Sequence, residues 1–521
     1  MKKLLSITLS LILVVLGTVF AAPESFATPD GANIPVIHIM GTGQEIYRID
    51  ENGNEEKVFP VEIPDGYIDE KAEIILPVFA KAFFTQQWDE FCDVLYECVS
   101  PILSGFALEP DGTTGGKTYI KWGWTRESLR DNKNQNGQYG VTSYFFTHDW
   151  RLSPYDIADT LHQYIEDVKY VTGAESVALY GRCFGSNIIA AYMEKYDGEH
   201  VSDVVHYCSA AYGAVQISKL FTGEMFIHPD GIERYVYDVD LEVETYVMDL
   251  IRACVTLMNK TYGLDIVSWA VENVMKDIYL DIFPRILVES YGSTPGYWSM
   301  VNVDDYEKAM ETVFYGADLE KYAGLIEKIE DYRNNVQLPF AENVQKQLDA
   351  GIEVSNIVKY GLQSVPLTKS SDELADGTVT VFESSFGATA ALAEETLSDE
   401  YIKNAIANGN GKYISPDRQI DASTCLMPER TWFIKDLGHK IFPSCVNGLV
   451  SDIINNEGFT VNDNPEYPQY LVCDVQANTL TPMTEENMNT TERWETDFFE
   501  ALSTFFVNLI QLIKNLTAKT E

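Results

Sequence analysis

The sequence predicts an α/β fold with a mostly parallel sheet, helices on both faces and an inserted helical cap or lid. Between 141 and 208, short apolar runs typical of buried strands alternate with segments of helical periodicity. Strands separated by helices in this way pair in parallel. A helical stretch from about 212 to 350, rich in Tyr, Met, Leu and Ile, interrupts the alternation, which resumes after 351.

The first buried strand is predicted at 34–40, where an apolar run ends in a loop of Gly41, Thr42 and Gly43. Helical periodicity follows between about 65 and 105. Glycine and asparagine then dominate 104–139, which is typical of exposed loop. We therefore expect a lid-like insert at about 60–139.

The remaining strands follow from short, nearly continuous apolar runs, and the remaining helices from apolar residues that recur with a period of about 3.6. These patterns predict helices at 156–171, 187–196 and 492–516, and strands at 141–147, 177–180, 204–208, 354–360, 378–382 and 431–435.

These elements divide the chain into five parts. They are a signal peptide (1–27), the first part of the core (28–211), the helical cap (212–350), the second part of the core (351–445) and a C-terminal extension (446–521). The amphipathic helix in the extension could pack on the protein's own surface, lie on a membrane or lipid particle, or mediate self-association.

Composition excludes several classes of protein. Of 521 residues, 37 are basic and 79 acidic, giving a net charge of −42. A surface so acidic repels nucleic-acid backbones and anionic lipid headgroups. The 45% of apolar residues exclude a disordered chain.

The N-terminus has the features of a signal peptide. Lys2 and Lys3 precede an uncharged apolar stretch at 4–20, and small residues at 21–27 suit a signal peptidase. The alternative is a retained membrane anchor, although the apolar run is short for a bilayer. We expect a secreted protein.

Eight cysteines are present, and no CxxC pair or zinc-like spacing occurs among them, so we expect no structural metal. Cys208 ends an apolar strand-like run and is interpreted as an inert core residue. In an oxidising compartment, Cys92 with Cys98 and Cys425 with Cys445 are candidate disulfides.

The segment Gly181, Arg182, Cys183, Phe184 and Gly185 fits the pattern G-x-nucleophile-x-G between a predicted strand and a predicted helix. Such a turn needs small residues two positions before and after the nucleophile, which it holds in a strained conformation. The alternative is a packing turn with a buried cysteine.

A nucleophile of this type needs a base and an orienting acid, which follow it in the order acid and then histidine. His439 lies after the last predicted core strand, and Asp376 lies in an Asp-Gly turn between, with Asp372 as a competitor. The backbone N–H groups of Thr42 and Phe184 are the candidate oxyanion hole.

Several stretches resemble the lecithin:cholesterol acyltransferase and lysosomal phospholipase A2 group of α/β-hydrolases. They are 146–154, with the letters FTHDWRLSP, the turn at 181–185, the DGTV run at 376–379 and the late Gly438 and His439. The loop at 40–43 is also similar, with Met40 where a proline is common. The resemblance spans roughly 34–445 and implies an α/β-hydrolase fold that cleaves acyl esters of lipids, by hydrolysis or by transfer, without a cofactor.

The chain departs from this group at the nucleophile, where the group uses serine and this chain has Cys183. Thiolate leaves readily, so a cysteine enzyme is expected to prefer thioesters, activated esters or acyl transfer. The cap, including 295–300, could wall an acyl-chain pocket or pack on itself, and the cap or last helix could touch a lipid surface. The alternatives are an inactive lipid- or surface-binding protein and a cysteine peptidase. Oligomeric state stays open.

Overall fold

The computed structural model of the protein describes residues 34–50, 52–61, 66–85, 87–121, 123–131, 143–224, 226, 228–238, 245–273, 282, 284–366, 368–488 and 498–518. The signal peptide expected at 1–27 lies outside these residues.

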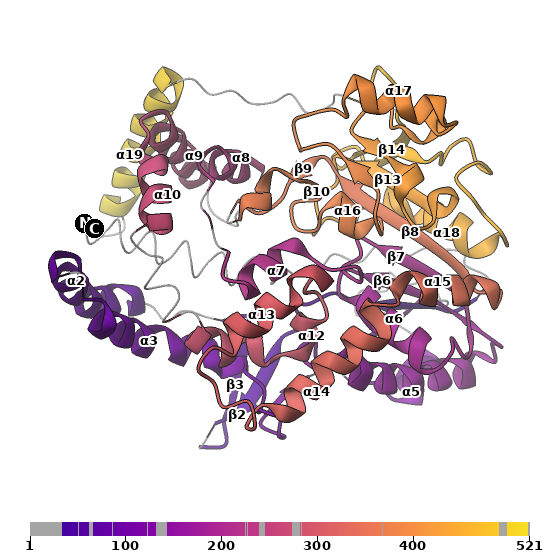
Figure 1. The fold of residues 1–521 in the computed structure, drawn as a ribbon, viewed down its shortest axis with the longest axis horizontal. Helices are drawn as coiled ribbons and strands as arrows, with labels where there is room; N and C mark the ends of the chain where they lie inside the picture. The colour runs from indigo at the N-terminus through magenta and orange to yellow at the C-terminus, as the bar shows by residue number, and fades with distance from the viewer. Residues whose placement is uncertain are drawn as a thin grey trace.

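Eight strands form a central sheet in the order β15-β14-β13-β8-β7-β6-β1-β5 (Figure 1). All neighbours pair in parallel except β14 with β15. The strands are β1 (Val36–Ile39), β5 (Ser143–Phe146), β6 (Val177–Arg182), β7 (Val201–Tyr207), β8 (Glu353–Tyr360), β13 (Thr431–Lys435), β14 (Tyr470–Asp474) and β15 (Thr479–Pro482). The mostly parallel α/β fold is confirmed, and it is consistent with an α/β-hydrolase-like arrangement.

Helices cover both faces because alternate residues of each strand enter different cores. Leu179 and Val204 belong to one core with α5 (Pro154–Thr172) and α6 (Gly185–Lys195). Their neighbours, such as Ala178 and Val205, belong to a second core with α18 (Asn447–Asn455). Both faces are therefore apolar, as a parallel sheet requires.

The segment between β7 and β8 is helical, as the sequence predicts, and falls into two groups. The first, α12 (Pro295–Trp298), α13 (Tyr306–Val313), α14 (Ala323–Tyr332) and α15 (Phe340–Asp349), packs on the core, where Tyr297 and Trp298 are buried. Along the chain, α7 (Val215–Phe221) follows β7 and precedes both groups. The second group stands away from the sheet (Figure 1) and comprises α8 (Pro229–Asp238), α9 (Thr245–Lys260) and α10 (Gly263–Asn273).

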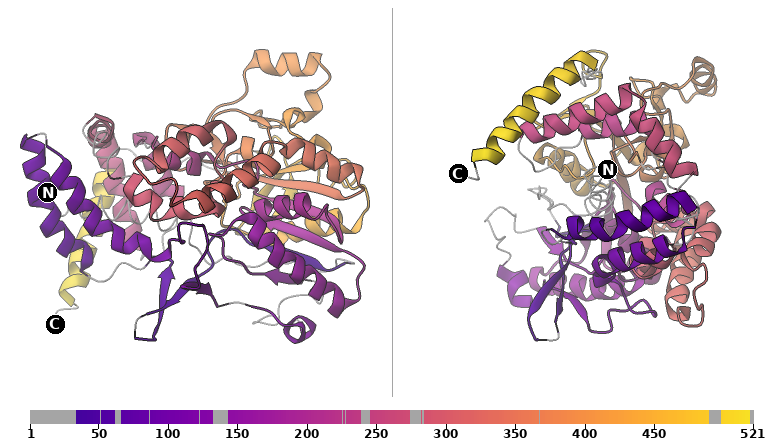
Figure 2. Two further views of the ribbon diagram at one scale, coloured as in Figure 1. Left: turned by 60° about the horizontal axis from the view of Figure 1, so that its bottom comes forward. Right: turned by 90° about the vertical axis from the view of Figure 1, so that its left-hand side faces the viewer.

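The last helix, α19 (Phe498–Ala518), lies along α9 in both figures and packs against it (Figures 1 and 2). Of the roles considered for this amphipathic helix, packing on the protein's own surface is therefore the one observed. Among the helices that the structure describes, none is both long and apolar enough to cross a membrane.

The predicted insert contains two long helices and contributes a strand to a second small sheet. The helices are α2 (Tyr67–Thr85) and α3 (Asp89–Leu103), and the sheet joins β2 (Ile46–Ile49), β3 (Glu55–Phe59) and β4 (Thr118–Ile120). Buried Arg151 ties this region to the core: it donates to both oxygens of Asp149, at 2.9 and 2.5 Å, and to the carbonyl of Phe106 at 2.6 Å.

Three expectations about elements differ from the structure. The stretch 104–139, expected to be exposed loop, contains β4 and the short helix α4 (Arg126–Asp131) among its described residues. The strand predicted at 378–382 is a turn followed by the short helix α16 (Val381–Ser384), because Thr380 and Glu383 form a capping box that starts a helix. The extension expected from 446 onward also contains two strands of the central sheet, β14 and β15. Shorter elements are α17 (Asp399–Ala407), β9 (Leu362–Gln363), β10 (Leu374–Ala375), β11 (Thr389–Ala390) and β12 (Ile420–Asp421).

Both candidate disulfides are wrong in this structure, where no disulfide joins any of the eight cysteines. Cys92 and Cys98 lie on the same helix, α3, and six residues of helix separate them by about 9 Å, which is too far for a bridge. Cys445 does not meet Cys425; its Sγ lies 3.8 Å from that of Cys473.

Candidate functional site

Cys183 lies in the turn between β6 and α6 with a φ of 51°. This left-handed conformation is uncommon outside glycine and marks local strain. A Cβ on Gly181 would lie 2.6 Å from Ile189 Cδ1, and one on Gly185 would lie 2.2 Å from the carbonyl oxygen of Ile39. The two glycines are therefore required by the packing of this turn against α6 and β1.

The loop after β1 passes directly beside the cysteine. A Cβ on Gly41 would lie 3.0 Å from Cys183 Cβ and 3.6 Å from its Sγ. The expected oxyanion residues flank this contact, since Thr42 follows Gly41 and Phe184 follows Cys183. Neither of their backbone N–H groups donates a hydrogen bond to another described residue.

Tyr297 on α12 is a neighbour that the sequence did not single out by itself. Its phenol is buried, and burial raises its pKa well above the usual value. The Cys183 thiol acts in the same direction, while a hydrogen bond with the Thr42 side chain opposes it. The sequence predicts that 295–300 could wall a pocket, which includes this tyrosine. Its position close to the Cys183 thiol depends on how α12 packs and has no signal in the sequence.

Asp376 and His439 form a hydrogen-bonded pair at the same edge of the sheet. His439 Nδ1 lies 2.7 Å from Asp376 Oδ2, and the His439 backbone N–H donates to the Asp376 carbonyl at 2.8 Å. The other carboxylate oxygen accepts from the backbone of Thr378 at 3.0 Å and of Val379 at 2.8 Å. The DGTV turn thus fixes the carboxylate, and the carboxylate orients the imidazole.

The pKa of His439 is well above its usual value. Burial disfavours the charged ring, but the Asp376 carboxylate, the thiols of Cys208 and Cys183 and the hydrogen bond to Asp376 together outweigh it. Cys183 is therefore within electrostatic reach of the imidazole. An imidazolium held in this way stabilises negative charge on a neighbouring thiol.

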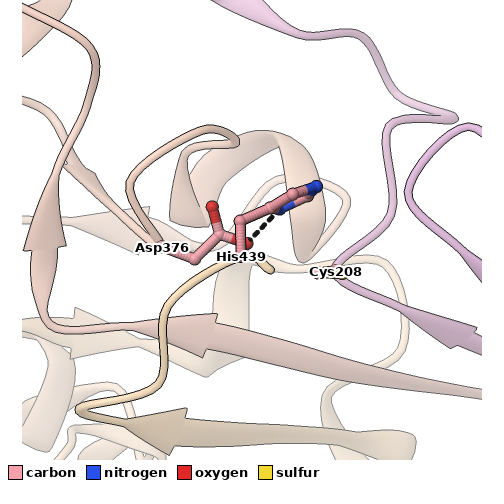
Figure 3. Close-up of side chains that lie close together, drawn as sticks. All are labelled: Cys208, Asp376 and His439. Atoms are coloured by element: carbon pink, nitrogen blue, oxygen red, sulfur yellow. Dashed lines mark hydrogen bonds and ion pairs between the residues drawn. The ribbon is translucent and has the colours of Figure 1, made fainter. Parts of the chain in front are cut away.

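Cys208 is the member of this cluster that sequence reasoning missed. It is fully buried, with a φ of 44°, and follows β7. Its sulfur, an Asp376 oxygen and a His439 nitrogen all lie within 4.8 Å of one another (Figure 3). The expected inert core residue thus lies beside the imidazole.

The two cysteines are neighbours across the sheet. Arg182 of β6 pairs with Tyr207 of β7, and the Cys183 N–H donates to the Tyr207 carbonyl at 3.1 Å. The carboxyl ends of parallel strands meet at one edge, so the residues that follow these two strands both approach His439.

The competing acid, Asp372, is placed elsewhere. Its Oδ2 lies 3.3 Å from His228 Nε2, and its Oδ1 lies 3.4 Å from Arg234. In the structure Asp376, and not Asp372, contacts His439.

Metal ligation at the site is limited by the hydrogen bond already present. Within the described ranges, Cys208, Asp376 and His439 are the three side chains close enough to hold one ion. Asp376 Oδ2 is engaged by His439 Nδ1, so an ion using both would displace this bond. The arrangement without an ion, an oriented imidazole beside a strained cysteine, is suited to nucleophilic catalysis.

No protein-family model matches the chain, and no curated protein matches it significantly.

Proposed function

We propose that the protein is a secreted acyl-ester hydrolase or acyltransferase that forms a covalent acyl-enzyme on Cys183. His439 is its general base and Asp376 orients the imidazole. One observation carries the proposal: the Asp376–His439 hydrogen bond of 2.7 Å lies at the sheet edge where the strained turn holds Cys183.

In the proposed reaction, His439 takes the Cys183 proton and the thiolate attacks the acyl carbonyl. The oxyanion that forms accepts hydrogen bonds from the Thr42 and Phe184 N–H groups. His439 then protonates the departing alcohol or thiol, and the carbonyl re-forms as a thioester on Cys183. Water or an acceptor alcohol, deprotonated by His439, cleaves this thioester and restores the thiol.

Cys183 is favoured over Cys208 as the nucleophile for two reasons. Cys208 is 0% exposed, whereas Cys183 is only partly buried. Cys183 also lies at the N-terminal end of α6, separated from its first residue by Phe184 alone, and this end of a helix stabilises negative charge.

The proposed substrates are lipid-like esters or thioesters. Support comes from the resemblance of four stretches to lipid acyltransferases and from the side chain of Tyr297 on α12, near the thiol. In this proposal the helices between β7 and β8 act as the cap over the acyl chain. Cysteine in place of serine suits thioesters and acyl transfer, because the thiolate is itself a good leaving group.

The test is the intact mass of the protein after brief incubation with p-nitrophenyl esters and acyl-thioesters. We expect an adduct of acyl mass on the wild type and on Cys208→Ala, and none on Cys183→Ala. Faster decay with added alcohols would indicate transfer. If no donor gives an adduct while lipid still binds, the enzyme proposal is wrong and the protein is a lipid-binding relative.

A further inference from the structure

Lys359 is a charged residue in the middle of the central sheet. It lies on β8, and its exposed fraction is 0%. Its ammonium donates to the carbonyl oxygens of three residues in the loop after β13: Gly438 at 3.3 Å, His439 at 2.9 Å and Ile441 at 2.8 Å. One buried cation therefore binds the backbone on both sides of the candidate catalytic histidine.

Two aromatic rings also lie close to this ammonium. The Lys359 Nζ lies 3.8 Å from the ring centre of Phe442 and 4.6 Å from that of Tyr207. Contacts of this kind stabilise a cation that has left water. Both rings belong to segments that reach the site, since Phe442 lies in the histidine loop and Tyr207 immediately precedes Cys208.

A lysine at this position is costly for folding alone. Burial of an ammonium group costs several kcal/mol before its partners compensate, and the flanking Val358 and Tyr360 show that the strand is otherwise suited to apolar packing. Without these contacts a short loop of this kind could adopt several conformations. The three carbonyl contacts select the one in which the imidazole meets Asp376.

We infer that Lys359 is the positioning residue for His439: it holds the histidine loop in the conformation that the Asp376–His439 hydrogen bond requires. The inference extends the proposed function, because it names the group that keeps the base in place. Its ammonium contacts the backbone carbonyls of the loop, so the positioning role is exerted through the loop backbone.

The chain offers a matched control in a second buried lysine on the adjacent strand. Lys435 of β13 is 7% exposed, and its ammonium lies 2.8 Å from Asp417 Oδ2 and 3.4 Å from Gln419 Oε1. Loss of this ammonium also disrupts a buried polar network, but one that includes no residue of the histidine loop. Lys435→Met therefore measures the structural cost without the positioning effect.

The experiment follows the His439 ring proton directly by NMR on protein labelled with ¹⁵N-histidine, which gives few signals because the chain has seven histidines. The Nδ1–H signal is assigned by its loss in His439→Gln. We expect the signal to disappear or broaden in Lys359→Met and to persist in Lys435→Met. Persistence in folded Lys359→Met would overturn the inference.

Two additions make the result decisive. If Lys359→Met does not fold, Lys359→Gln, which retains a neutral donor, is expected to fold and to weaken the signal; an unchanged signal there overturns the inference. The acyl-adduct assay on the same samples separates the two proposals. Loss of the signal with no adduct even on wild type refutes the proposed function alone, whereas an adduct formed at wild-type rate by Lys359→Met refutes the positioning role alone.

A second site concerns the far end of the same loop. Cys445 and Cys473 have sulfur atoms 3.8 Å apart. Asn478 holds the segment in place: its Oδ1 accepts from the Cys445 N–H at 3.1 Å, and its amide donates to Ser444 Oγ at 2.8 Å. Cys473 lies on β14 and is buried.

We also propose that Cys445 and Cys473 are a site of disulfide formation by exchange with a small disulfide such as oxidised glutathione. Cys445, the more accessible thiol, attacks as the thiolate and releases one glutathione thiolate, giving a mixed disulfide. The Cys473 thiol then attacks Cys445 sulfur and releases the second glutathione as thiol. Both protein thiols are oxidised and one glutathione disulfide is reduced.

The test is intact mass and peptide mapping after incubation with oxidised glutathione. We expect a loss of two hydrogens, a cross-linked peptide pair containing both cysteines, and neither in Cys445→Ser. Cys92→Ser is the control that should retain the bridge. A stable glutathione adduct on Cys445 without closure, or no reaction at Cys445, would refute the proposal.

Discussion

Cys183 and Cys208 follow neighbouring strands, both adopt positive φ angles, of 51° and 44°, and both influence the same histidine. They differ in what surrounds them. Cys183 is partly exposed beside the glycine loop and precedes an eleven-residue helix, α6. Cys208 is sealed at 0% exposure. In the proposed function, access and a helix N-terminus, rather than proximity to a base, distinguish Cys183 from Cys208 as the nucleophile.

The largest expected effect separates the two thiols directly. Cys183→Ala should lower the rate of acyl-adduct formation by at least roughly 10³-fold, because no attacking atom remains. Cys208→Ala should stay within roughly tenfold of wild type. Rapid-quench mass spectrometry with an acyl-thioester measures both. Loss of the adduct in Cys208→Ala with retention in Cys183→Ala would reverse the assignment.

The two acids give the next largest effect. Asp376→Asn should slow acylation by roughly 10²–10⁴-fold, because the imidazole loses its orienting carboxylate. Asp372→Asn, which changes the contacts with His228 and Arg234 instead, should leave the rate within about twofold. Steady-state kinetics on both variants measures the difference, and equal losses would show that Asp376 has no special role.

A pair of glycine substitutions tests how much the close contact between the Cys183 turn and β1 contributes to stability. Gly185→Ala should destabilise the protein by about 1–3 kcal/mol or more, because the new methyl would lie 2.2 Å from the Ile39 carbonyl oxygen. Gly123→Ala meets open space and should be close to neutral. Urea denaturation followed by circular dichroism provides the comparison.

The dependence on pH follows from the raised pKa of His439. Because this pKa exceeds the unfolded value of about 6.5, the stabilisation from the charged ring is fully present below that value. It is lost as the pH rises through the raised, folded-state value. The difference in melting temperature between wild type and His439→Gln should therefore shrink as the pH rises into the alkaline range. A difference that shrinks on acidification instead would contradict the raised pKa of His439.

The smallest expected effect is inhibition by zinc, which tests whether the Cys208 sulfur is available as a ligand beside His439. A zinc ion can use the Cys208, Asp376 and His439 side chains only by displacing their hydrogen bond, so micromolar zinc should inhibit acylation and a chelator should restore it. In Cys208→Ser, which lacks the soft ligand, the inhibition constant should rise by roughly tenfold. Equal inhibition of both proteins would place the ion elsewhere.

The residues of the candidate site were predictable to different degrees. The turn around Cys183, the DGTV run and the late histidine each have a local pattern in the sequence, and the structure brings Asp376 and His439 into contact. Cys208 has no such pattern: it differs from a core cysteine only by ending its strand beside Cys183. That relation depends on the register of β6 with β7, which a single sequence does not encode locally.

The elements of the fold were also predictable to different degrees. Long apolar periodicities gave the parallel sheet, whereas short segments governed by capping did not follow their apolar pattern. At 378–382 the capping box of Thr380 and Glu383 outweighed β propensity. Lys359 shows the opposite case, because a lysine inside a predicted buried strand requires partners, and those partners lie in the histidine loop.

The contact between α9 and α19 has a consequence for how the protein is made. α9 ends at Lys260 and α19 begins at Phe498, so synthesis at about 5–20 residues per second leaves α9 without its partner for roughly tens of seconds. During that interval an apolar helix face is open to other chains and to chaperones. Completion of this part of the molecule must therefore wait until α19 has emerged from the ribosome.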